Sequence, residues 1–193
     1  MTHSRTEFSL PFVGLRCLAM SDPQLHVAPF QYAIDFVLPL GTDVLAGANG
    51  IVEEVRLESR MGGMNPQYQD ERWLNYIVLR HKYGEFSIYG HLAFQCSTLK
   101  VGDVVSQGQR IAATGMSGLM TLPHLHFHVY HIATDGLPVS VYPTFHIPFH
   151  IHRPRYSREL EPIFTNIKLI SRTWSQSAGA GEIPSPMPAP ENH

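Results

Sequence analysis

The sequence is poor in cysteine and in charge, and both shortages exclude classes of protein. Only Cys17 and Cys96 occur among 193 residues, far apart and outside any C-x-x-C pair, which excludes a disulfide framework and a zinc ribbon. Lysine and arginine number 14 against 16 aspartates and glutamates. The resulting formal net charge of -2 favours neither a nucleic acid nor an anionic membrane as a partner.

Long apolar runs are also missing. No run approaches the roughly 18 residues of a membrane span, and the N-terminus contains no unbroken apolar segment of signal-peptide length. We therefore expect a soluble chain without a membrane span and without a recognisable export signal.

The sequence also lacks helical periodicity. No long segment repeats its apolar residues with a period of 3.6, so helices should be few. Short β-branched and aromatic runs instead alternate with turn signals such as Asn49-Gly50. Residues 75–81 and 85–92 form a plausible hairpin, and the 44% of hydrophobic residues suffice for a sizeable core. The pattern predicts an all-β fold.

The distribution of proline predicts where the folded part ends. Nine of the fifteen prolines lie from Pro138 onward, and residues 175–193 are small, polar and proline-rich, which is typical of disorder. We expect an N-terminal flank, a β domain, a C-terminal extension and a disordered tail, with the bounds 1–29, 30–145, 146–174 and 175–193.

Three histidines alternate along one predicted strand, residues 123–132. Residues two apart in an extended chain point to the same face, so His124, His126 and His128 should line one side at intervals of roughly 6.6 Å. A neutral imidazole binds zinc and also serves as a general base near pH 7. Two such rings could divide these tasks, although a histidine-rich strand with solvated rings gives the same pattern.

Five segments, in order and spacing, resemble the lysostaphin/LytM-type zinc metallopeptidases, which cut peptide bonds in bacterial peptidoglycan. They are Gln31-Tyr32-Ala33-Ile34-Asp35 with the following Pro39-Leu40-Gly41-Thr42, Asn49-Gly50-Ile51-Val52, Asn75-Tyr76-Ile77-Val78 with Tyr89-Gly90-His91-Leu92, residues 101–109, and Gly115-Met116-Ser117-Gly118 leading to Pro123-His124-Leu125-His126-Phe127. The resemblance covers residues 30–145 and implies an antiparallel β core of the duplicated hybrid motif type, with the site in a groove over one sheet.

The resemblance also implies roles for individual residues. Asp35 and His126 match metal ligands, and Gln31 stands at the position of the third. His91 and His124 match the pair that flanks the metal-bound water. The implied protein is a metalloendopeptidase that holds one Zn²⁺ per chain and hydrolyses peptide bonds, in peptidoglycan cross-links or another peptide substrate, through a metal-activated water. Action on peptidoglycan would place it in the cell envelope, which requires an internal start in this sequence or another route of export; otherwise the substrate is a different peptide.

Gln31 is the main departure from the family pattern, which has histidine there. An amide oxygen is a poorer zinc donor than imidazole. Gln31 could still ligate, or His26 could fold back past Pro29 to supply the missing nitrogen. Alternatively, the site is impaired, and the domain binds cell-wall material or regulates other hydrolases.

Other functions fit fewer residues. A biotin- or lipoyl-carrier domain needs a modified lysine at a hairpin tip, and Lys82 and Lys100 lack the usual neighbours. A histidine phosphocarrier has no use for a carboxylate in register with its histidines, as Asp35 is. Ser117 lacks a nucleophile-elbow pattern, and nothing activates Cys96.

Overall fold

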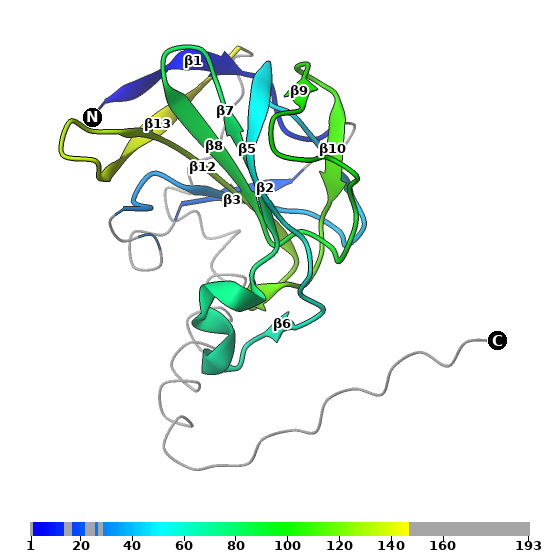
Figure 1. The fold of residues 1–193 in the computed structure, drawn as a ribbon. Coiled ribbons are helices and arrows are strands. Elements are labelled where there is room, and N and C mark those ends of the chain that lie inside the picture. Colours follow the sequence, from blue (N-terminus) through cyan, green and yellow to red (C-terminus); the bar gives the residue numbers. More distant parts are fainter. Residues whose placement is uncertain (1, 14–16, 22–25, 27–28, 147–193) are drawn as a thin grey trace. The chain divides into compact units, whose positions relative to one another are not determined.

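One curled sheet of nine strands dominates the part of the chain that the structure describes (Figure 1). This computed structural model describes residues 2–13, 17–21, 26 and 29–146. The order within the sheet is β1-β13-β12-β8-β7-β5-β9, and β3 joins it through β12 while β2 pairs with β3. The all-β prediction is confirmed, and the helices in these described ranges are two short 3-10 turns.

The elements are short and closely spaced along the chain. The strands of the main sheet are β1 (His3–Phe8), β2 (Leu18–Met20), β3 (Ile34–Val37), β5 (Gly50–Arg56), β7 (Tyr76–Arg80), β8 (Glu85–Gly90), β9 (Val104–Val105), β12 (His124–Ile132) and β13 (Pro138–Phe145). Two small ribbons pair β4 (Asp43–Leu45) with β10 (Arg110–Ala113), and β6 (Gly62–Gly63) with β11 (Gly118–Leu119). The helical turns are η1 (Pro66–Gln69) and η2 (Glu71–Trp73).

Strand β12 is the centre of the sheet. Along one edge its first half pairs antiparallel with β3, and its second half pairs antiparallel with β13. Along the other edge it pairs antiparallel with β8. Most of its backbone groups are therefore hydrogen-bonded on both sides, which fixes the direction of every side chain on this strand.

The two faces of β12 have different chemistry. Leu125, Phe127 and Val129 have no exposed surface and belong to the hydrophobic core. Phe127 makes edge-to-face or tilted ring contacts with Phe8 and Tyr89, at centroid distances of 5.5 and 5.3 Å. Because side chains alternate along a strand, the histidines between these core residues lie on the opposite face.

Three strands of the sheet, β1, β2 and β13, were not predicted from the sequence. In β1 the buried side chains are Ser4, Thr6 and Phe8, and because two of the three are polar the strand shows no regular apolar alternation. The Glu85 carboxylate accepts hydrogen bonds from the backbone N–H groups of Arg5 and Thr6, at 2.7 and 2.8 Å. β13 contains two prolines, Pro138 and Pro143, and proline usually argues against an interior strand. It nevertheless pairs in parallel with β1 across an irregular register.

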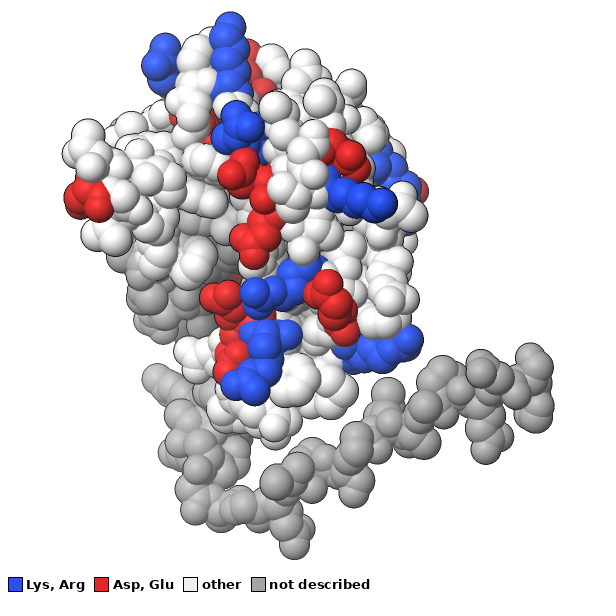
Figure 2. All heavy atoms as spheres, in the orientation of Figure 1, with Lys and Arg blue, Asp and Glu red and all other residues white. Residues whose placement is uncertain are grey.

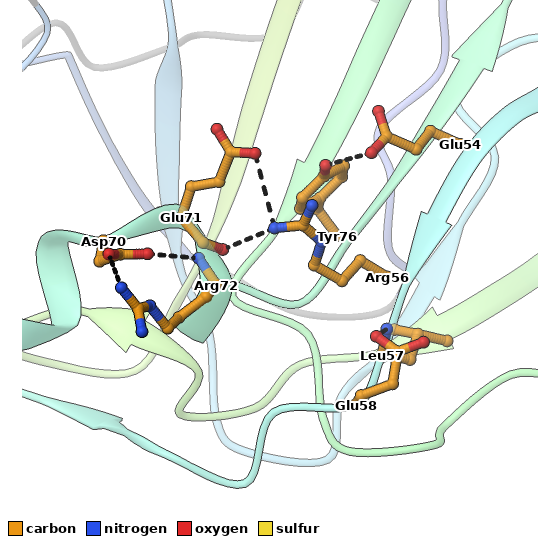
Figure 3. Close-up of polar contacts among 8 residues, drawn as sticks. All are labelled: Glu54, Arg56, Leu57, Glu58, Asp70, Glu71, Arg72 and Tyr76. Carbon is orange, nitrogen blue, oxygen red and sulfur yellow. Dashed lines mark hydrogen bonds and ion pairs between the residues drawn. The ribbon is translucent and has the colours of Figure 1, made fainter.

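The expected long loop at residues 58–72 contains β6, η1 and most of η2. Polar contacts fasten it to β5, as Figure 3 shows. Arg56 on β5 donates to the backbone oxygen of Glu71 at 3.1 Å and lies 3.5 Å from its carboxylate. Asp70 caps η2 by accepting from the Arg72 backbone N–H at 3.0 Å, and Tyr76 donates to Glu54. The segment is thus an ordered insertion.

Charged groups on the face shown in Figure 2 are mixed in sign, with lysines and arginines interspersed among aspartates and glutamates. Within the described residues, no helix is long and apolar enough to cross a membrane. The predicted extension at 146–174 and the predicted disordered tail at 175–193 fall almost entirely on residues outside the described part.

His81 at the end of β7 is a structural histidine. Its Nδ1 donates to the backbone oxygen of Asn49 at 2.8 Å, so its Nε2 accepts from the Ser87 hydroxyl at 2.7 Å. The ring is buried and meets Phe8 edge to face at 5.2 Å. Burial lowers the pKa of His81 below its usual value.

This burial predicts an acid-dependent loss of stability. Because the His81 pKa is lower in the folded than in the unfolded chain, its contribution is complete above about pH 6.5 and falls as the pH drops toward the folded pKa, by up to about 1.4 kcal/mol per pH unit. His81→Gln should show a shallower decline in the free energy of unfolding, measured with urea between pH 8 and 5. His131→Gln on β12 is the control. Equal slopes for wild type and His81→Gln would contradict the prediction.

Candidate active site

The register between β3 and β12 places a carboxylate directly beside an imidazole. Asp35 is the cross-strand partner of His126, and the His126 Nδ1 lies 2.9 Å from an Asp35 carboxylate oxygen. Gly90 on β8 is the other neighbour of His126. A Cβ at Gly90 would lie 3.3 Å from the His126 Cβ, so the absent side chain leaves room for the ring.

Asp35 is buried among histidines and stays ionised. Its exposed fraction is 8%, and burial alone would raise its pKa. Hydrogen bonds with His126 and His26 oppose burial and hold the pKa of Asp35 well below its usual range. The site therefore contains a fixed negative charge, and its side-chain partners among the described residues are imidazoles.

His91 and His124 form a second pair beside this carboxylate. Their ring centroids are 4.5 Å apart, and the His124 Nε2 lies 3.7 Å from Asp35. Burial lowers the pKa of His91 to about 3 and also lowers that of His124, so both rings are neutral near pH 7. His91 follows directly after β8 and has a left-handed backbone with φ of 58°, which is uncommon for a residue with a side chain.

Backbone carbonyls set the proton positions on both rings. The His91 Nδ1 donates to the Ser117 oxygen at 2.7 Å, and the His124 Nδ1 donates to the Leu122 oxygen at 2.8 Å. A carbonyl can only accept, so each ring carries its proton on Nδ1 and has a free lone pair on Nε2. The pair thus offers two unprotonated nitrogens that can accept protons.

Buried Asn75 fixes the position of Ser117, whose carbonyl binds His91. Asn75 donates its backbone N–H to the Ser117 hydroxyl at 3.0 Å, and Ser117 is the residue whose carbonyl binds His91. The Asn75 side chain also bonds both backbone groups of Ser59, at 2.9 and 2.8 Å, and the Leu92 oxygen at 3.1 Å. The insertion after β5 is therefore tied to the histidine pair.

His128 is buried, with 1% of its surface exposed. Its Nε2 lies 2.9 Å from the Ser140 hydroxyl of β13, and its ring meets Phe30 at 5.3 Å. The sequence left open whether the histidines of this strand are solvated. His128 and His124 are both buried. His128 packs behind His126, with 6.4 Å between ring centroids.

The structure brings together four of the five residues singled out from the sequence, namely His91, His124, Asp35 and His126. Gln31, the fifth, is an exposed residue. His26, which the sequence raised as an alternative, is 6% exposed and places its Nε2 3.2 Å from Asp35. Asn75 and Ser117 lie in segments that resemble the family, but the sequence assigned them no role, because the groups they bind are backbone groups of distant segments.

Three donors converge in a way that suits a metal ion. One ligand atom each from His26, Asp35 and His126 all lie within 4.8 Å of one another. One carboxylate and two imidazoles form a donor set typical of catalytic zinc, which takes three protein ligands and keeps a fourth position open. The residues present therefore fit a zinc ion.

Comparison with known proteins identifies the family of this chain. The sequence pattern described as peptidase family M23 matches residues 29–140, more than half of the chain. The chain therefore belongs to peptidase family M23.

Two relatives are much longer than this chain. An uncharacterized metalloprotease of Haemophilus influenzae is 36% identical over 110 residues, which cover 56% of this chain and 20% of the relative. The peptidoglycan DD-endopeptidase ShyA of Vibrio cholerae is 34% identical over 115 residues, which cover 60% of this chain and 23% of ShyA. The chain thus spans less than a quarter of either relative.

A solved structure shares the fold. The M23 metalloprotease pseudoalterin, from the deep sea, is 18% identical, with a TM-score of 0.50 over 71% of this chain and 76% of that one. At this identity the likeness concerns the fold alone.

The hydrogen bonds of the Asn75 side chain predict that its truncation lowers the free energy of unfolding substantially. Asn75→Ala would leave the backbone groups of Ser59 and the Leu92 oxygen buried without partners, so we expect it to lower the free energy of unfolding by about 2–4 kcal/mol. Asn65→Ala is the matched control, because its side chain makes one exposed hydrogen bond, to Gln67. Urea unfolding followed by tryptophan fluorescence measures both. A loss at Asn75 no larger than at Asn65 would refute this account of the network.

Proposed function

We propose that this chain is a zinc-dependent endopeptidase that hydrolyses peptide bonds in peptidoglycan cross-links. Membership of peptidase family M23 supports the peptidase activity. The observation that carries the proposal is the neutral His91–His124 pair beside the buried Asp35–His126 contact. This arrangement joins two proton acceptors to a set of metal ligands on one face of the sheet.

The substrate class is inferred from relatives. ShyA of Vibrio cholerae is a peptidoglycan DD-endopeptidase, and its matching region aligns with 60% of this chain. We transfer the substrate class, peptidoglycan peptide, and not the particular bond, since most of the length of ShyA has no counterpart here.

Asp35 and His126 would hold the zinc ion together with a third donor. When bound, the ion supplies Lewis acidity, which lowers the pKa of a water molecule and polarises a peptide carbonyl. The low pKa of Asp35 keeps its carboxylate ionised and available as a ligand at neutral pH. His126 would bind through Nδ1, the nitrogen that faces Asp35.

His91 and His124 would move the protons of the reaction. Each has a free lone pair on Nε2, and either can accept a proton from the attacking water. The ring that then carries the proton can donate it to the oxyanion or to the leaving amine. The Ser117 and Leu122 carbonyls, by holding the Nδ1 protons, keep both Nε2 atoms free for this task.

The exposed position of Gln31 favours a second candidate function. If the site binds no metal, the domain would be a catalytically impaired member of the family that binds cell-wall material or regulates other hydrolases. Metal content separates this alternative from the peptidase.

Alanine variants test the division of roles. His91→Ala and His124→Ala should lower peptidoglycan digestion by about 10²–10⁴-fold while retaining zinc, because they remove only proton transfer. Asp35→Ala and His126→Ala should lose both zinc and activity. Digestion of purified peptidoglycan and zinc per chain by mass spectrometry are measured on the same preparations.

His131→Ala, on the same strand and partly exposed, is the control and should keep both properties. Full activity in all four site variants would rule out the mechanism. Wild type that binds no zinc even after its addition would favour the binding module.

A further inference from the structure

The connection between β2 and β3 places a buried histidine against the metal-ligand pair. His26 is 6% exposed, and its Nε2 lies 3.2 Å from Asp35 Oδ2. Its ring meets that of His126 nearly edge to face, with 5.3 Å between centroids. The three side chains therefore surround one small volume.

The spacing of these atoms is that of ligands sharing an ion. Two ligands at about 2.0–2.1 Å from a tetrahedral zinc are roughly 3.4 Å apart. The separations of 3.2 Å between His26 and Asp35, and 2.9 Å between Asp35 and His126, lie close to this value. The two contacts use different oxygens of Asp35, so one carboxylate lies between the two imidazoles.

Gln31 occupies a different environment. Gln31 stands at the position of the first ligand in the His-x-x-x-Asp pattern, but it is exposed and its side chain is a neutral amide. Its neighbour Phe30 is the residue that packs against the histidine face, 6.2 Å from His126 and 5.3 Å from His128.

We propose that His26 is the third metal ligand and replaces the donor missing at Gln31. The inference rests on the proposed metal centre and goes beyond it, since His26 lies before the segment that the family pattern matches, residues 29–140. Imidazole is a stronger zinc donor than an amide oxygen, so this replacement restores a donor set of two imidazoles and one carboxylate.

The pairing of β2 with β3 explains how a residue so far upstream can reach the site. Met20 at the end of β2 lies opposite Asp35 on β3. The chain that leaves β2 therefore starts beside the carboxylate and must return to β3, and His26 lies on this connection. The metal site would thus depend on the β2 segment, which the family pattern does not include.

A purely structural His26 is the competing explanation. In that case the ring would only donate a hydrogen bond to Asp35, and another donor of similar length would serve as well. His26→Gln distinguishes the two, because its amide N–H₂ can donate to Asp35 but its amide is a poor zinc ligand.

The test is zinc affinity of the full-length chain, measured by competition with a chromophoric chelator. His26→Ala and His26→Gln should each weaken zinc binding by at least about 100-fold, since loss of a residue that merely supports a ligand already costs about 10–100-fold. Gln31→Ala, the matched control, should bind zinc like wild type. The visible absorption of bound Co²⁺ should change in both His26 variants and remain unchanged in Gln31→Ala.

Several results would overturn the assignment. His26→Gln that binds zinc as tightly as wild type would do so, as would loss of zinc binding in Gln31→Ala or a wild type that binds no zinc. Tighter zinc binding in His26→Ala would also do so, because it would mean that the His26 ring competes with zinc for Asp35. Thermal unfolding with chelator present verifies that the variants fold. Zinc binding that needs His26, in a wild type that digests no peptidoglycan, would refute the peptidase proposal and leave the ligand assignment standing.

Discussion

The buried carboxylate of Asp35 is the group on which the candidate site depends. Removing a carboxylate from water costs several kcal/mol unless charges or hydrogen bonds compensate it. Here the compensation comes from three histidines, His126 and His124 on β12 and His26 on the connection between β2 and β3. A packing arrangement without one of these histidines would leave the Asp35 carboxylate exposed or insufficiently compensated. The carboxylate therefore connects three separate segments, β3, β12 and the connection between β2 and β3.

Strand β12 makes this arrangement rigid. Leu125 and Phe127 anchor one face in the core, and the alternation of side chains then directs His124 and His126 to the other face. A well-packed core resists small displacements, because close-packed side chains have few alternative positions. The positions of the histidines are consequently set by residues that take no part in the chemistry.

His91 is held by different means. It lies outside a strand, in a left-handed conformation, and its ring is oriented by a carbonyl of the loop before β11. That loop is fixed in turn by Asn75, which also binds the insertion after β5. Strained backbone persists only where its surroundings determine it, and such strain concentrates at functional sites. The insertion therefore contributes to the site through the network rather than by direct contact with the metal-ligand pair.

The sequence by itself determined the all-β class, the face shared by His124 and His126, and the pairing of Asp35 with a histidine in the family pattern. These properties depend on the two-residue period of a strand and on motifs that are local in the chain. Only the tertiary structure decided that His26 approaches Asp35 while Gln31 faces solvent, and that β1 and β13 complete the sheet. Those outcomes depend on backbone pairing and chain reversal between distant segments, where buried serine and threonine leave no apolar pattern to read.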